Sequence, residues 1–348
     1  MTVASCPPLR LISLSSNIDA GRDFLNERCL QIGHVLPVSD KVFNECFPSE
    51  RSFLLVQGKR PEALFAYFPG EHKGTPMARL RIVTSSKVGL KEATRKAEEL
   101  AMAQEKLNIR TNVFGYEEKK LAGLQSLGYQ ICANLPETVS LNGRRYDWHF
   151  VYKDLTSRYS FSVKRPYAKP GLYPEVQVKK AEKPKLRVRG YRPEDRKTLD
   201  RFASDPMVIR GIANGVFEGL YPWLVGGYQQ MVDSRLMFPI VCEDESRGEP
   251  VGLLDLFKQT QDVMQHTMGM AIYVKPEYQG IGVGTMLMQG MKRLAMRLHL
   301  ARVWLGVYEG NAPAVRLYKK TGFVECGKLP GWLQEGYVNE IYMTLKLD

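Results

Sequence analysis

The stretch VKPEYQGIGVGTMLM, Val274–Met288, decides the fold of this chain. A strand pattern, MGMAIYV, ends at its first residue, and apolar residues at helical spacing follow the stretch's glycines. Glycines at a strand-to-helix junction let several backbone N–H groups form a concave nest, to which the helix N-terminus adds partial positive charge. The three glycines Gly280, Gly282 and Gly284 therefore predict a pyrophosphate-binding loop. A plain glycine-rich turn is the alternative.

Two other phosphate-binding loops do not fit these glycines. A Walker loop is excluded because no Gly-Lys-Ser/Thr follows. The dinucleotide fingerprint is excluded because the spacing is Gly-x-Gly-x-Gly, late in a mostly antiparallel run of strands.

The surrounding residues predict a mixed α/β domain. A helix is expected to begin at Pro193, and the turn Ser246-Arg247-Gly248 joins two strands. The remaining expected elements are strands over Leu186–Arg192, Phe238–Asp244, Pro250–Phe257, Met268–Val274 and Arg302–Val307, helices over Thr285–His299 and Ala312–Lys320, and two closing strands.

The loop resembles the Gln/Arg-x-x-Gly-x-Gly/Ala signature of the GCN5-related N-acetyltransferases (GNAT). Asn311–Phe323, NAPAVRLYKKTGF, resembles the family's Asn-x-x-Ala…Leu-Tyr-x-x-x-Gly-Phe segment, and YVNEIYMTLKL resembles its closing strand. The three motifs follow in the family's order over residues 186–348. The resemblance implies an α/β (α+β) fold in which a mixed, mostly antiparallel sheet is flanked by helices.

The resemblance also implies a binding site for acetyl-CoA. Backbone groups of Ile272, Tyr273 and Val274 would bind the pantetheine arm, in the splay between the family's fourth and fifth strands. Asn311 would contact the cofactor's arm. The pyrophosphate would be bound by the loop amides of Gln279, Gly280, Ile281, Gly282, Val283, Gly284 and Thr285. No metal is implied, and the sequence offers no plausible metal cluster.

The resemblance makes Tyr318 the candidate catalytic acid, which would protonate the leaving thiolate. A phenol, with a pKa of about 10, suits a thiolate of similar basicity. The alternative is a half-buried aromatic side chain on a helix face.

The general base is left open. Many family members carry a Glu on the fourth strand, where this chain has Gly269. A chain of water molecules would also serve. The candidate side chains, each with a structural alternative, are Asp255, His266, Thr267 and Glu340. The thiols of Cys242 and Cys326 are interpreted as small apolar strand residues rather than ping-pong nucleophiles.

The first part of the chain repeats the second. GYQICANLP, Gly128–Pro136, lies 194 residues before GFVECGKLP, Gly322–Pro330. The patterns over residues 9–129, which include a helix expected over Lys91–Gln104, follow the later order. At this offset none of the expected cofactor residues is kept: Gln279, Gly282, Gly284, Asn311 and Tyr318 fall on Ser85, Val88, Leu90, Glu117 and Leu124. The sequence predicts two tandem GNAT-like domains, a degenerate copy without a cofactor loop over 1–155 and a catalytic domain over 186–348.

The positive charge lies mainly between these two parts. The formal net charge is +12, and residues 156–185 hold eight Lys or Arg against two Asp or Glu, which is half of the excess. Four prolines in Ser157–Pro184 predict an extended, solvated linker. Such a segment gives no support for a nucleic-acid partner.

The rest of the composition points to a cytoplasmic protein. Six scattered cysteines with no C-x-x-C argue against a disulfide scaffold. No apolar run approaches the roughly 20 residues of a membrane span, and the Pro pair near the start does not fit a signal peptide.

The expected function is transfer of acetyl from acetyl-CoA to a primary amine in a ternary complex. A small-molecule acceptor is favoured. A protein N-terminus or lysine, and a non-catalytic acyl-CoA-binding module, are the alternatives. The segment Tyr221–Leu224 is read either as an acceptor-side loop or as an aromatic plug in the domain interface. The oligomeric state is left open.

Overall fold

The structure is a computed structural model that describes residues 7–69, 77–158, 181–182, 184–198, 228–330 and 339–347. The chain divides into two compact units. The first comprises Met1–Pro166, Gln261–Val263 and Gly331–Tyr337, and the second comprises Tyr167–Thr260, Met264–Pro330 and Val338–Asp348. Most of the expected linker 156–185, and all of Tyr221–Leu224, lie outside the described residues.

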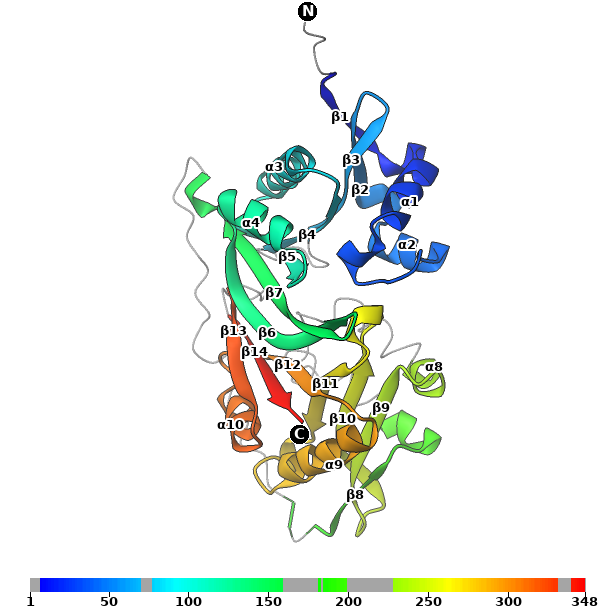
Figure 1. Cartoon of the computed structure of the whole chain (residues 1–348). Coiled ribbons are helices and arrows are strands. Elements are labelled where there is room, and N and C mark those ends of the chain that lie inside the picture. Colours follow the sequence, from blue (N-terminus) through cyan, green and yellow to red (C-terminus); the bar gives the residue numbers. More distant parts are fainter. Residues whose placement is uncertain are drawn as a thin grey trace, which may run out of the picture. The chain divides into compact units, whose positions relative to one another are not determined.

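The described strands of the second unit pair in the order β13-β14-β12-β11-β10-β9-β8 (Figure 1). Neighbouring strands are antiparallel except β11 and β12, which are parallel. Its elements are β8 Leu186–Gly190, α8 Tyr228–Asp233, β9 Met237–Asp244, β10 Glu249–Lys258, β11 Thr267–Val274, α9 Val283–Arg297, β12 Arg302–Tyr308, α10 Ala312–Lys320, β13 Val324–Leu329 and β14 Glu340–Lys346.

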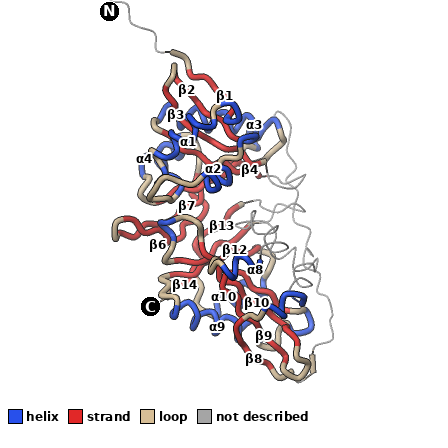
Figure 2. The backbone as a smooth tube through the Cα atoms, turned by 90° about the vertical axis from the view of Figure 1, so that its right-hand side faces the viewer, coloured by secondary structure: helices blue, strands red, loops and turns tan. Residues whose placement is uncertain are grey.

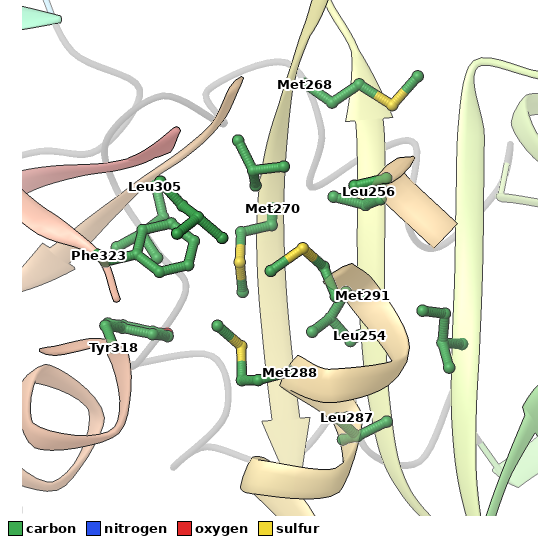
Figure 3. Close-up of a cluster of buried hydrophobic side chains, with 14 of the residues drawn as sticks. Leu254, Leu256, Met268, Met270, Leu287, Met288, Met291, Leu305, Tyr318 and Phe323 are labelled. Carbon is green, nitrogen blue, oxygen red and sulfur yellow. The ribbon is translucent and has the colours of Figure 1, made fainter. Parts of the chain in front are cut away.

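One face of this sheet packs against α9 and α10. Figure 3 shows Leu254 and Leu256 of β10 meeting Leu287, Met288 and Met291 of α9 in one apolar cluster. All five side chains are fully buried. Apolar residues four positions apart on α9 face this cluster, as the 3.6-residue period of the sequence predicts. The opposite face of the sheet carries a separate small cluster of Val241, Leu253 and Tyr273.

The first unit has a matching strand order. Its strands β1-β2-β3-β4-β5-β7-β6 correspond one by one to β8-β9-β10-β11-β12-β14-β13 of the second unit. Its one parallel pair, β4 and β5, is at the place of β11 and β12. Its elements are β1 Leu9–Ser13, α1 Ile18–Asn26, α2 Asp40–Cys46, β2 Ser52–Gln57, β3 Arg60–Phe68, β4 Met77–Thr84, α3 Lys87–Ala103, β5 Asn108–Phe114, α4 Glu118–Ser126, β6 Gln130–Leu141 and β7 Arg144–Asp154. Figure 2 draws these helices in blue and the strands in red.

The helix α3 begins at Lys87, four residues before the expected start at Lys91. The Ser86 side chain caps it by accepting a hydrogen bond of 3.0 Å from the Gly89 N–H. The structure thus adds a first turn that contains a glycine, whose low helix propensity hides this turn from a sequence-based prediction.

The predicted fold class is confirmed: each unit holds a mixed, mostly antiparallel sheet flanked by helices. The helix over Ala312–Lys320 is found with those bounds, and α9 is shifted by two residues from the predicted range. Within the described part of the chain, no helix is both long and apolar enough to cross a bilayer.

Candidate functional site

The strands β11 and β12 separate part-way along their length. Their parallel pairing runs only from Thr267↔Arg302 to Gly269↔Trp304, although β11 continues to Val274. On its other side β11 stays paired with β10 as far as Val274. The splay therefore exposes one backbone edge of Ile272, Tyr273 and Val274, the residues that the family resemblance assigned to a pantetheine arm.

The glycine-rich loop begins where β11 ends, and a buried tyrosine fixes its start. Tyr278 is 1% exposed and donates a hydrogen bond of 2.9 Å to Asp244 Oδ2 on β9. The Lys275 N–H also donates to the Val251 carbonyl at 3.0 Å. These contacts tie the loop to the sheet, so the following glycines have a fixed position at the N-terminus of α9.

The loop backbone needs glycine at two positions. Gly280 and Gly282 have φ angles of 81° and 101°, in the left-handed region that side chains disfavour. A Cβ atom at either position would meet nothing within 4 Å, so the space beside the loop is open. Gly282 is the N-cap of α9, and no side chain caps it. An uncapped helix N-terminus that faces open space fits an anionic group such as a pyrophosphate.

The third glycine has a packing role. A Cβ atom on Gly284 would lie 2.9 Å from the Leu317 side chain of α10. At the 194-residue offset, Gly284 corresponds to Leu90 of α3 and Leu317 corresponds to Gly123 of α4. The first unit therefore has the large and the small residue exchanged, and Leu90 lies against Gly123. The packing of the two helices thus accommodates Leu90 in the first unit where the second unit has Gly284.

Two of the predicted cofactor residues already make local hydrogen bonds. Gln279 Nε2 donates to the Val274 carbonyl at 3.1 Å and closes the loop. The Asn311 Oδ1 atom accepts a hydrogen bond of 3.3 Å from the Ala314 N–H and caps α10.

Tyr318 lies on α10 in the apolar cluster of the second unit, with its ring centroid 5.9 Å from that of Phe323. The side chain is 7% exposed, and burial raises the pKa of its phenol well above the usual range. The phenol therefore keeps its proton at neutral pH, which is the state that an acid needs.

The candidate bases differ in their surroundings. Thr267 is buried and donates to the Met264 carbonyl, a local structural contact. Glu340 is buried, with its carboxylate packed over Gly306 of β12. Asp255 of β10 is 2% exposed, and burial raises its pKa to about 7. His266 is partly exposed, and its carbonyl accepts a hydrogen bond from the Ala301 N–H. The pKa of Asp255 is therefore close to neutral pH, which suits a group that takes up and releases a proton during turnover.

The cysteine thiols do not suit nucleophilic catalysis. Cys242 is fully buried, and burial raises its pKa to about 11. Burial also raises the pKa of Cys326, whose sulfur lies 3.3 Å from the Thr344 hydroxyl. A thiol with a raised pKa holds little thiolate at neutral pH. No group of three or more His, Cys, Asp or Glu among the described residues is placed to hold a metal ion.

The equivalent helix start in the first unit is closed by side chains of that unit. Only two residues separate β4 from α3, whereas eight separate β11 from α9. The buried carboxylate of Glu62 accepts hydrogen bonds from the Ser85 hydroxyl at 3.1 Å and the Ser86 hydroxyl at 2.5 Å. A carboxylate of the chain thus lies at the helix N-terminus, where the second unit leaves open space.

The sequence did not predict two residues of these sites. Tyr228 donates a hydrogen bond of 2.6 Å to Asp255, and Glu62 lies at the start of α3. Each contact joins residues more than 20 positions apart, and no local pattern marks them.

Comparison with known proteins finds a family match within the second unit. Residues 212–323 match the model of the Acetyltransferase (GNAT) family. The streptothricin acetyltransferase of Streptomyces lavendulae is 35% identical over 78 residues, which are 21% of this chain and 41% of that protein. The putative phosphinothricin acetyltransferase YwnH of Bacillus subtilis is 34% identical over 99 residues, 28% of this chain and 60% of its own. The chain thus spans about half the length of these relatives.

The spermidine N-acetyltransferase of Vibrio cholerae, solved with CoA and spermine, is similar over 47% of this chain and 95% of its own, with 22% identity and a TM-score of 0.40. The family match and the curated relatives show that this chain contains a GNAT acetyltransferase domain.

Proposed function

We propose that the GNAT acetyltransferase domain of this chain, residues 186–348, transfers the acetyl group of acetyl-CoA to a primary amine by direct attack in a ternary complex. The observation that supports this most is the uncapped N-terminus of α9 beside Gly280 and Gly282, at the end of the splay between β11 and β12. Isothermal titration with acetyl-CoA, followed by thiol release with a panel of amines, tests the proposal. Binding without turnover of any amine would favour the acyl-CoA-binding module.

The chain's own groups would hold the cosubstrate in three places. The exposed backbone edge of Ile272–Val274 would bind the pantetheine arm, as an added strand does. The amides of Gln279–Thr285 would bind the pyrophosphate. Asn311 would contact the arm through its remaining amide N–H groups, because its carbonyl oxygen caps α10.

Bound acetyl-CoA would supply a thioester carbonyl that an amine attacks. Backbone N–H groups in the splay would polarise this carbonyl. The Tyr318 phenol, kept protonated by burial, would give its proton to the leaving sulfur. The raised pKa values of the Cys242 and Cys326 thiols support direct attack over a covalent acyl-enzyme.

The first unit, in this proposal, is a second GNAT-like copy over 1–155 that does not bind acetyl-CoA, joined through the basic segment 156–185. The shared strand order and the 194-residue repeat support a duplication. The short β4–α3 connection and the Glu62 carboxylate at the start of α3 support the loss of binding.

A small molecule is the favoured acceptor. Two curated relatives are named for small amine-containing compounds, streptothricin and phosphinothricin. A protein acceptor is the second candidate, because another relative is named an N-alpha-acetyltransferase. The panel should include spermidine, phosphinothricin and a peptide with a free N-terminus. The acceptor that is acetylated fastest decides between a small-molecule and a protein substrate. The five free cysteines among the described residues fit a reducing, cytoplasmic setting.

A further inference from the structure

The carboxylate of Asp255 lies on the face of the sheet opposite α9 and α10. Its neighbours on β10, Leu254 and Leu256, pack into the cluster with α9. Because side chains alternate along a strand, Asp255 shares the other face with Leu253 and with Tyr273 of β11. This is the face on which α8 supplies Tyr228.

The hydrogen bonds of this carboxylate are incomplete. Tyr228 Oη donates to Asp255 Oδ1 at 2.6 Å. Asp255 Oδ2 is equally buried, yet no described residue donates a hydrogen bond to it. A buried carboxylate oxygen without a donor is unfavourable, since its hydration is lost without replacement. Such an atom fits a site for a donor from outside the chain, and a cationic donor fits best.

The same face of the sheet has no room for a side chain at Gly269 of β11. Gly269 of β11 pairs with Phe257, whose ring fills the space that a side chain at residue 269 would need. Asp255 lies two residues from Phe257 on the same face of β10 and pairs with Ala271. The chain therefore has no carboxylate on β11 there, but holds one on the adjacent strand, two residue pairs further along.

The Asp255 carboxylate lies beside the part of β11 that opens at the splay. Asp255 pairs with Ala271 of β11, and the pairing of β11 with β12 ends two residues earlier, at Gly269. Tyr273 belongs to the strand edge that faces the splay. The carboxylate is therefore on the strand adjacent to the open edge of β11, where the pantetheine arm and its thioester would bind in the proposed function.

We propose that Asp255 binds the ammonium group of the acceptor through Oδ2 and accepts its proton. This inference rests on the proposed acetyl transfer and names the group that selects and activates the amine. The carboxylate takes one proton from the ammonium, the neutral nitrogen then forms a bond to the acetyl carbon, and the carbon–sulfur bond breaks. The Tyr318 phenol protonates the sulfur. The second proton lost from nitrogen restores the phenol through solvent, and the proton on Asp255 leaves to solvent.

The groups around Asp255 agree with this role. The Tyr228 phenol donates to it, and Tyr273 lies on the same face of the sheet. Tyr191 lies against the Tyr228 ring, and the Arg196 guanidinium lies 5.3 Å from the centre of that ring. Burial raises the pKa of Asp255 to about 7, and the Tyr228 hydrogen bond opposes this rise. The carboxylate is therefore ionised at slightly alkaline pH and still basic enough to take a proton.

The experiment measures kcat/KM against pH from 5 to 9 for three forms of the full chain, with the fastest amine of the panel. In the wild type, activity should rise with pH through an apparent pKa near 7. Asp255→Asn should lose this limb and about 100-fold in kcat/KM at pH 8, with unchanged acetyl-CoA affinity. Tyr228→Phe should move the limb to higher pH, because it removes a hydrogen bond that favours the charged carboxylate.

The inference is overturned if Asp255→Asn keeps the limb, or if Glu340→Gln removes it instead. It is also overturned if Asp255→Asn loses acetyl-CoA binding in parallel with activity, which a general loss of structure would cause. Circular dichroism at each pH identifies an unfolded variant, and Tyr228→Phe then still tests the direction of the shift. A wild type that binds no acetyl-CoA would contradict the proposed function itself, before any variant is made.

Discussion

A Cβ atom built on Gly269 would lie 2.1 Å from the ring of Phe257, its partner on the adjacent strand. No side chain fits at this position while the ring is present. The absence of a carboxylate on this part of β11 is therefore a matter of packing between two strands.

This contact gives the first prediction. Gly269→Glu should lower the free energy of unfolding by about 1–3 kcal/mol, since it overpacks a buried position. Phe257→Ala in the same chain should recover part of that loss by removing the ring. Urea unfolding of both forms measures the difference, and an equal loss with and without Phe257→Ala would show that the ring is not the obstacle.

Acetyl-CoA binding should depend on the space beside Gly282. Gly282→Val should abolish measurable binding, because the new side chain would enter the open space at the start of α9. Gly248→Val is the matched control: Gly248 also has a positive φ, 63°, and nothing within 4 Å, but it lies in the β9–β10 turn. Titration calorimetry should show normal binding for the control. Normal binding by both variants would contradict the assignment of the loop.

Removing the phenol of Tyr318 should slow turnover without weakening binding. Tyr318→Phe should lower kcat about 100-fold and change the acetyl-CoA affinity less than twofold, because only the proton donor is lost. The raised pKa of this phenol also means that kcat should show no alkaline limb from it below pH 10. Thiol release under single-turnover conditions measures the step, and a rate equal to the wild type would remove Tyr318 as the acid.

The first unit should bind no acetyl-CoA. We expect one binding site per chain by calorimetry, and none after Gly282→Val. Glu62→Ala should lower the free energy of unfolding by about 1–3 kcal/mol, because the Ser85 and Ser86 hydroxyls lose their shared acceptor. A stoichiometry of two for the wild type would show that the first unit has kept its site.

The stability of the chain should depend on pH through Asp255. Its pKa is about 7 in the folded chain and about 4 in an unfolded one, so between these values the folded state binds more protons. The free energy of unfolding must therefore fall as pH rises through this window. Asp255→Asn cannot titrate, so its free energy of unfolding relative to the wild type should be higher at pH 8 than at pH 5, by at most about 3 kcal/mol. Urea unfolding at the two pH values tests this, and equal differences would contradict it.

Much of the fold could be predicted because its signals are local. The helical spacing of Leu287, Met291 and Ala295 defines α9 and its buried face. The glycines Gly280 and Gly282 mark a backbone with positive φ angles, which few other residues adopt. The position of the loop between strand and helix followed from these residues, whereas the open space beside it is seen only in the structure.

Other features could not be predicted because they depend on contacts across the sheet. The start of α3 at Lys87 depends on Ser86 and on Glu62 from another strand. The sequence left the general base open among four residues, since nothing local shows how deeply each is buried.

The amino-acid sequence by itself determined two similar halves, a glycine-rich helix start in only one of them, and Tyr318 on the helix that follows. Each of these is a pattern of neighbouring residues or a repeat at a fixed offset. Only the tertiary structure decided that Phe257 excludes a side chain at Gly269, and that Asp255 is buried beside Tyr228 with one oxygen lacking a donor among the described residues. Burial and pairing are set by strands that meet in space, and they control both the packing and the pKa of the group proposed to activate the amine.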